Sequence, residues 1–254
     1  MTDTTPGEET FVSHLVELRD RLVKASIGVA IICAVLMFWP GPAAIYDFLA
    51  QPMIASLPKG SHMIATGVIS PFLVPMKVTL VVALILALPW VFYQLWAFIA
   101  PGLYTHEKRL VLPLVLSSSL LFMGGVAFCY FFVFGRVFKF IGDFAPSSIA
   151  VMPDIENYLD FIMSMCLAFG ATFEVPVVVV ILVRTGLVSV EKLKAVRPYA
   201  IVGSFVIAAI VTPPDVVSQL ALAVPMWILF ELGLLLAPIF VRATQAPEED
   251  PVQP

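Results

Sequence analysis

Charged side chains are scarce in this sequence. Only 13% of its 254 residues are Asp, Glu, Lys or Arg, whereas 60% are hydrophobic and the mean hydropathy is +1.00. A soluble domain of this length carries roughly a quarter charged residues, so the deficit indicates that lipid is the main solvent. The net charge of −4 is small and spread along the chain, and no basic patch points to nucleic acid as a partner.

Metal-binding and catalytic patterns are also missing. The three cysteines, Cys33, Cys129 and Cys166, lie in apolar runs with no CxxC spacing and no histidine nearby, so they predict no metal site. The stretch HEKRL begins like a zinc-protease helix, but Leu110 stands where the second histidine is needed. No serine elbow and no phosphate-binding loop is present. Any work that this protein supports must therefore draw on energy from outside its own chain.

Long apolar runs dominate what is present. A transmembrane helix needs about 20 predominantly apolar residues, and six segments meet or approach that length. We expect an all-α membrane protein with six transmembrane helices, at Leu22–Trp39, Pro71–Ala100, Leu110–Phe134, Tyr158–Val183, Pro198–Val211 and Val216–Phe240. The sequence predicts loops at Pro40–Ser70 and Gly135–Asn157.

The last two runs are joined only by TPPD, which begins at Thr212. The fifth run would form a helix of about 21 Å at 1.5 Å per residue, short of an apolar bilayer core of about 30 Å. Glu231 interrupts the sixth run well before its end. We therefore expect two short helices, and either a bilayer that thins around them or a partner that covers them.

Lysine and arginine predict the orientation, because they gather on the cytoplasmic side of membrane proteins. With a cytoplasmic N-terminus, most of the 14 basic residues fall inside: Arg19, Arg21, Lys24, Lys108, Arg109, Arg184, Lys192, Lys194, Arg197 and Arg242. Only Lys59, Lys77, Arg136 and Lys139 fall outside. The sequence thus predicts a multi-pass protein of the cell membrane with both termini in the cytoplasm.

The two ends of the chain differ from the spans between them. In residues 1–21, Phe11, Leu15 and Leu18 recur at helical spacing. This pattern predicts an amphipathic helix along the inner membrane face that continues into the first span, and it favours retention of this segment over cleavage as a signal peptide. Residues 243–254 lack apolar periodicity, so we expect a single domain over residues 1–242 and a disordered cytoplasmic tail.

Two charged groups stand at the predicted inner face, HLVELRDRL and APGLYTHEKR. Glu17 in the first and Glu107 in the second each have arginines beside them, so local ion pairing is one interpretation. The other is that both carboxylates await an outside cation. Arginine would suit them, because its planar fork of donors fits a carboxylate bidentately.

At this point the sequence resembles the TatC family, the membrane receptor of the twin-arginine protein translocase. The resemblance covers the chain to about Arg242 and rests on HLVELRDRL, QLWAFIAPGLYTHEKR, FGATFEVPVV and VTPPDVVSQLALAVPMWILFELG. It implies six helices with cytoplasmic termini and the recognition of signal peptides that carry paired arginines on folded proteins. It also implies export driven by the proton-motive force, with the single-span proteins TatA and TatB and other TatC copies as partners. Neither an enzymatic activity nor a cofactor is implied.

The resemblance also assigns roles to residues. It places signal-peptide binding on Glu17 and Glu107, with Arg19 and Phe98 nearby. A polar patch for the single-span partners maps onto Thr212 and Gln219, around the tip of the last hairpin.

Glu174 lies between two apolar runs, in LAFGATFEVPVVVVILV. An ionised carboxylate at that depth costs several kcal/mol. One interpretation is a protonated acid that bonds to a carbonyl freed by Pro176, which has no N–H to donate. The other is that Glu174 faces the concave side of a curved six-helix arrangement and keeps water at mid-membrane, as a polar contact for a partner helix or a passing signal peptide. The family resemblance favours the second, because the family carries an acid there.

Two other classes of protein share some of these features. A secondary transporter would have an intramembrane acid and broken helices, but it should show an internal repeat, and the sequence has none. An intramembrane protease would need serine, paired-aspartate or zinc signatures, which are missing.

Overall fold

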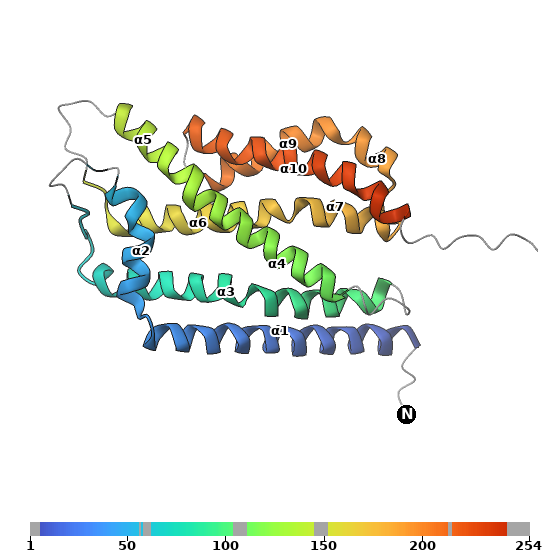
Figure 1. Cartoon of the computed structure of the whole chain (residues 1–254). Coiled ribbons are helices and arrows are strands. Elements are labelled where there is room, and N and C mark those ends of the chain that lie inside the picture. Colours follow the sequence, from blue (N-terminus) through green and yellow to red (C-terminus); the bar gives the residue numbers. More distant parts are fainter. Residues whose placement is uncertain are drawn as a thin grey trace, which may run out of the picture.

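The computed structural model describes residues 6–55, 57, 62–103, 111–144, 152–212 and 215–242, and nearly all of them are helical (Figure 1). The helices are α1 (Pro6–Phe38), α2 (Pro42–Ile54), α3 (Ser70–Leu103), α4 (Val111–Phe128), α5 (Phe134–Phe144), α6 (Ile155–Phe173), α7 (Val175–Arg184), α8 (Val190–Ala195), α9 (Arg197–Val211) and α10 (Val216–Arg242). A π-helical turn, Cys129–Val133, joins α4 to α5.

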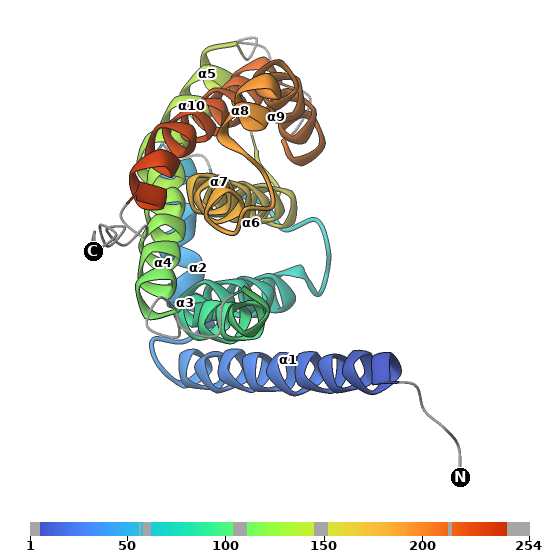
Figure 2. The ribbon, with the colours of Figure 1, turned by 90° about the vertical axis from the view of Figure 1, so that its right-hand side faces the viewer.

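Successive helices run back and forth between two ends of the molecule (Figure 1). The start of α1, the end of α3, helix α8 and the end of α10 lie at one end, which we call the terminal end; α2 and the end of α5 lie at the other. Figure 2 shows α1 at one edge beside α3, α9 at the opposite edge, and α6 and α7 between them.

Five segments are long and apolar enough to cross a membrane. They are Ser13–Phe38, Ser70–Ile99, Leu112–Phe144, Ile155–Arg184 and Val216–Ile239, and the apolar helix Arg197–Val211 is shorter. This result confirms an all-helical membrane protein. It also corrects one part of the expected fold, as α9 has only 15 residues but α10 has 27. The prediction that both of the last helices are short is therefore wrong for the sixth.

Glu231 does not interrupt α10, because its charge is paired. Arg197 Nη2 lies 2.7 Å from Glu231 Oε2, and this ion pair joins the first residue of α9 to the middle of α10. The acid is therefore accommodated inside an apolar helix by a cation from its neighbour.

Two predicted loops contain helices. Helix α2 lies within the predicted loop Pro40–Ser70; it begins just after Gly41, whose φ of 90° suits glycine, and Pro42 takes its first position. At 13 residues it is too short to be recognised by length as a span. Helix α5 lies within the predicted loop Gly135–Asn157, so the third membrane segment continues to Phe144.

Helix α1 is a single helix of 33 residues and runs straight (Figure 1). Its described N-terminal part continues the axis of the first span without a bend, over about 50 Å in all. How this part lies against the membrane face stays a prediction.

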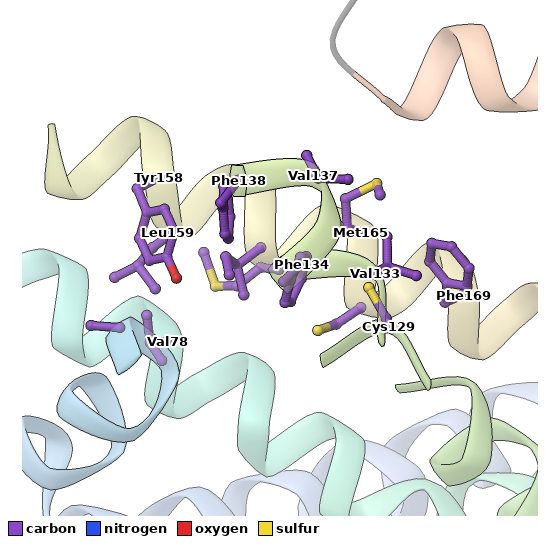
Figure 3. Close-up of a cluster of buried hydrophobic side chains, with 14 of the residues drawn as sticks. Val78, Cys129, Val133, Phe134, Val137, Phe138, Tyr158, Leu159, Met165 and Phe169 are labelled. Carbon is purple, nitrogen blue, oxygen red and sulfur yellow. The ribbon is translucent and has the colours of Figure 1, made fainter. Parts of the chain in front are cut away.

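The main hydrophobic core lies away from the terminal end, between α2, α3, α5 and α6 (Figure 3). Phe134 and Leu159 are fully buried there, and the rings of Phe138 and Tyr158 lie 5.5 Å apart. Polar contacts at the same end tie the start of α3 to the start of α6. The pairs are Ser70 with Glu156 (2.9 Å), Lys77 with Asp160, and Thr66 Oγ1 with Asp154 (2.9 Å). Hydrogen bonds from the Asn157 backbone and from Thr66 hold the pKa of Asp154 below its usual value.

Helices α4 and α6 approach each other closely at Gly125. A Cβ there would lie 2.5 Å from the carbonyl oxygen of Phe169 and 3.0 Å from Cα of Gly170. These are backbone atoms, so they cannot turn aside as a side chain does. The neighbouring Gly124 has no such constraint, since its Cβ would meet only a Phe173 ring atom at 4.0 Å.

Gly125→Ala is therefore expected to destabilise the fold by about 1–3 kcal/mol, the usual effect of overpacking. Gly124→Ala should be neutral or stabilising by up to about 1 kcal/mol, because alanine favours a helix over glycine. Thermal unfolding of the purified proteins in detergent measures both. Equal melting temperatures for the two variants would contradict the close approach at Gly125.

Candidate functional site

The first two candidate residues lie where the start of α1 runs beside the end of α3. The rings of His14 and Phe98 lie 4.7 Å apart at 30° to one another. Glu17 is one turn further along α1, so this ring contact sets the position of its carboxylate relative to the end of α3. The structure thus places Glu17 one helical turn from a residue that contacts Phe98, and their joint role in binding a signal peptide stays a prediction.

Glu17 forms an ion pair with Arg21 of its own helix. Arg21 donates to the same oxygen, Glu17 Oε1, from Nε at 2.9 Å and from Nη2 at 2.8 Å. The Glu17 side chain is 36% exposed and that of Arg21 is 24% exposed. Local pairing is therefore real, but it occupies one carboxylate oxygen. The described residues provide no hydrogen bond to the other, Oε2, which can still accept from an outside donor.

Arg19 points away from this pair. Its Nη2 lies 2.8 Å from Asp20 Oδ1, and its side chain is 71% exposed. An ion pair this exposed contributes little stability, so Arg19 can exchange partners at little cost. Glu107 lies in residues 104–110, between α3 and α4 and outside the described part of the chain, so its distance from Glu17 stays a prediction.

Glu174 lies at a break between two helices. Helix α6 ends at Phe173, and α7 begins at Val175, with Pro176 in its first turn. The Glu174 N–H donates to the Ala171 carbonyl at 3.1 Å. Its side-chain Oε1 is buried and has no hydrogen-bond partner among the described residues. The structure therefore gives no support to a bond from this acid to a carbonyl freed by Pro176.

Polar groups of two other helices lie around this break. They belong to Ser118 of α4 and Trp96 of α3. Trp96 packs with Val115 of α4 and Val177 of α7. Val115 is one turn from Ser118, and Val177 is one turn from Glu174. In the described structure Ser118 Oγ and Trp96 Nε1 are buried without partners. Sequence reasoning missed both residues, although three consecutive serines in an apolar helix were a signal that could have found Ser118.

Thr212 and Gln219 lie beside the turn between α9 and α10. Thr212 is buried, and its hydroxyl donates to the Ala208 carbonyl at 2.8 Å. The amide nitrogen of half-buried Gln219 donates to the Phe205 carbonyl at 3.4 Å. Both side chains thus bond to α9, Gln219 over the longer distance, and their contact with a partner protein stays a prediction.

In the part of the chain that the structure describes, no three His, Cys, Asp or Glu side chains come together as metal ligands would. What the described residues offer is a carboxylate and an aromatic ring at the terminal end, and an unpaired acid at a helix break. Such groups bind and orient other molecules.

Comparison with known proteins fits this picture. The profile of the family "Sec-independent protein translocase protein (TatC)" matches residues 13–225. The chain is 50% identical to the Sec-independent protein translocase protein TatC of Azotobacter chroococcum mcd 1, over 96% of this chain and 95% of that one. It is 48% identical to the TatC of Escherichia coli K12, over 97% and 93%.

A solved structure also matches. It is described as the crystal structure of the twin-arginine translocase receptor TatC; the TM-score is 0.78 at 36% identity, over 89% of this chain and 98% of that one. Sequence and structure thus lead to one conclusion, which confirms the resemblance: the chain belongs to the TatC family of Sec-independent protein translocase proteins.

Proposed function

We propose that this protein binds the paired arginines of signal peptides on folded proteins and passes those proteins to a translocase in the cell membrane. The observation that carries the proposal is the geometry of Glu17. This carboxylate is held in place by Arg21 and by the contact between His14 and Phe98, and it keeps Oε2 without a partner among the described residues. A charge-assisted hydrogen bond from an arginine would satisfy that oxygen.

A second acid is needed to read a second arginine, and Glu107 supplies it. Helix α3 carries Phe98 and ends at Leu103, four residues before Glu107 in the sequence, so we propose that Glu107 acts at the same end of the molecule as Glu17. Two acids at one end of the molecule suit two adjacent arginines, since one carboxylate would be saturated by the first.

Both termini are proposed to lie in the cytoplasm, with six helices crossing the membrane. Support comes from the basic residues of α8, which lies at the terminal end and carries Lys192 and Lys194, and from those of the first two thirds of α1, Arg19, Arg21 and Lys24. The positive-inside rule places such an end in the cytoplasm, where a signal peptide on a folded protein would arrive.

The partners follow from the family. TatA, TatB and further copies of TatC are proposed to assemble with this protein, and the proton-motive force is proposed to drive export. Glu174 and the turn that carries Thr212 and Gln219 are the proposed polar contacts. The short α9 supports this, because about 22 Å of helix leaves part of the apolar layer for a partner or a thinner bilayer.

Binding of a signal peptide tests the proposal. The purified protein is presented with a twin-arginine signal peptide that carries a photo-crosslinker, and with the same peptide in which both arginines are lysines. We expect at least tenfold less crosslinking with lysines, because a lysine cannot bind a carboxylate bidentately. Equal crosslinking of the two peptides would contradict arginine recognition.

A further inference from the structure

An open groove lies between α1 and α3. It is lined by Lys24, Ile27, Gly28, Ile31 and Trp90 and has a volume of about 300 Å³. Gly28 shapes it: a Cβ at this position would lie 2.3 Å from Cδ1 of Trp90. Because no side chain projects from Gly28, the indole ring lies directly against α1 and forms one wall of the groove.

The indole wall is held firmly. The Trp90 N–H donates to the backbone carbonyl of Lys24 at 2.9 Å, and the Trp90 ring stacks on Tyr93 at 5.8 Å. With its only polar atom bonded, Trp90 presents an apolar surface to the groove. Tryptophan and tyrosine gather at the depth where lipid headgroups meet acyl chains. Lys24 lies near the inner end of the first span expected from the sequence, Leu22–Trp39, so we assign the Lys24 side of the groove to that depth.

A positive charge stands at one side of this apolar surface. The other basic side chains of the same helix already have anions, since Arg19 pairs with Asp20 and Arg21 pairs with Glu17. Lys24 is exposed and makes no ion pair with any residue that the structure describes. Its long stem can follow the apolar wall while its ammonium group reaches the headgroup layer.

We infer that this groove binds one glycerophospholipid with an anionic headgroup. Its acyl chain lies along Ile27, Ile31 and the Trp90 ring, and its phosphate lies beside the Lys24 ammonium group. A lipid is favoured over a membrane helix of a partner protein by charge, because Lys24, unpaired among the described residues, calls for an anion beside the apolar wall. The pairing of an apolar wall with one cation matches a lipid that has both parts.

Native mass spectrometry of the detergent-purified protein tests this inference. Phosphatidylglycerol and phosphatidylcholine are titrated separately, and the occupancy of the first bound lipid is measured. We expect about fivefold tighter binding of phosphatidylglycerol, the effect of one lysine near an anionic headgroup. Lys24→Gln should remove this preference, and Gly28→Leu should weaken both lipids because its side chain fills the groove.

Lys192→Gln is the matched control, since Lys192 is an exposed lysine of α8 and does not line the groove. Lys192→Gln should keep the preference for phosphatidylglycerol over phosphatidylcholine. If it loses as much of this preference as Lys24→Gln does, lipid binding follows the total charge of the protein and the inference is wrong. Lipid binding by Gly28→Leu at the wild-type level would also overturn it. If Gly28→Leu does not fold, Ile31→Trp fills the groove from its exposed rim and carries the same expectation.

A photo-crosslinking amino acid at position 31, in intact membranes, decides between occupants. We expect an adduct with phospholipid. A protein adduct in its place would show that the groove is a helix-docking surface and would overturn the inference.

Discussion

Replacing both Glu17 and Glu107 by glutamine is expected to reduce crosslinking of a twin-arginine signal peptide by at least a hundredfold. A charge-assisted hydrogen bond contributes about 1.5–3 kcal/mol. Exposure of the Glu17 side chain (36%) lowers this, so we expect about tenfold for each acid, or about 1.4 kcal/mol. The two single variants and the double variant are compared by photo-crosslinking at equal amounts of inserted protein.

Glu191→Gln is a suitable control, because Glu191 is an exposed acid in the first turn of α8, at the same end of the molecule. It should crosslink like the unchanged protein. If neither single variant nor the double variant differs from that control, Glu17 serves only to pair with Arg21 and the binding role is wrong.

Changing Glu174 to leucine is expected to reduce the rate of protein export about tenfold. The structure leaves Glu174 Oε1 buried and unpartnered among the described residues, with the Ser118 hydroxyl nearby. Such a group calls for water or a polar partner, and leucine can accept neither. Glutamine keeps the hydrogen bonding of a neutral acid, so the export rate of Glu174→Gln should stay within about twofold of the unchanged rate. A twofold change corresponds to less free energy than the loss of one hydrogen bond, which is about 1 kcal/mol.

Val178→Leu tests whether extra bulk on this part of α7 matters by itself. Val178 is 49% exposed and lies one turn beyond Glu174, and its substitution should leave export unchanged. Export and partner crosslinking are measured for Gln, Ala and Leu at position 174, at equal expression. Wild-type behaviour of Glu174→Leu in both assays would mean that the acid has no part in export.

The spans could be predicted because membrane helices are recognised by composition, which the sequence states directly. Helices α2 and α5 could not be predicted in the same way. The 13 residues of α2 are too few for a span, and α5 mixes Arg136 and Lys139 with its apolar residues. Only packing shows that Phe134 and Val137 of α5 are fully buried.

In the candidate site too, contacts within one helix could be predicted from the sequence, and contacts between helices could not. The Glu17–Arg21 pair follows from a spacing of four residues on one helix, and the sequence raised it as one of two interpretations. Contacts between helices carry no local signal: His14 meets Phe98, and Trp96 packs with Val177, across long stretches of chain. The pairing of Glu231 with Arg197 is of the same kind. It explains how α10 continues through an acid that appeared to end it.

Among the helices that the structure describes, α1 packs extensively only against α3, and no residue of its apolar stretch is fully buried. If a peptide binds Glu17 as proposed, its pull reaches the rest of the protein through this one interface, a single seam. That seam includes the His14–Phe98 ring contact near the binding end and the Trp90–Lys24 hydrogen bond further along. Displacement of α1 is resisted by few contacts outside the seam, so the helix can move as a lever while the main core between α3, α5 and α6 keeps its packing.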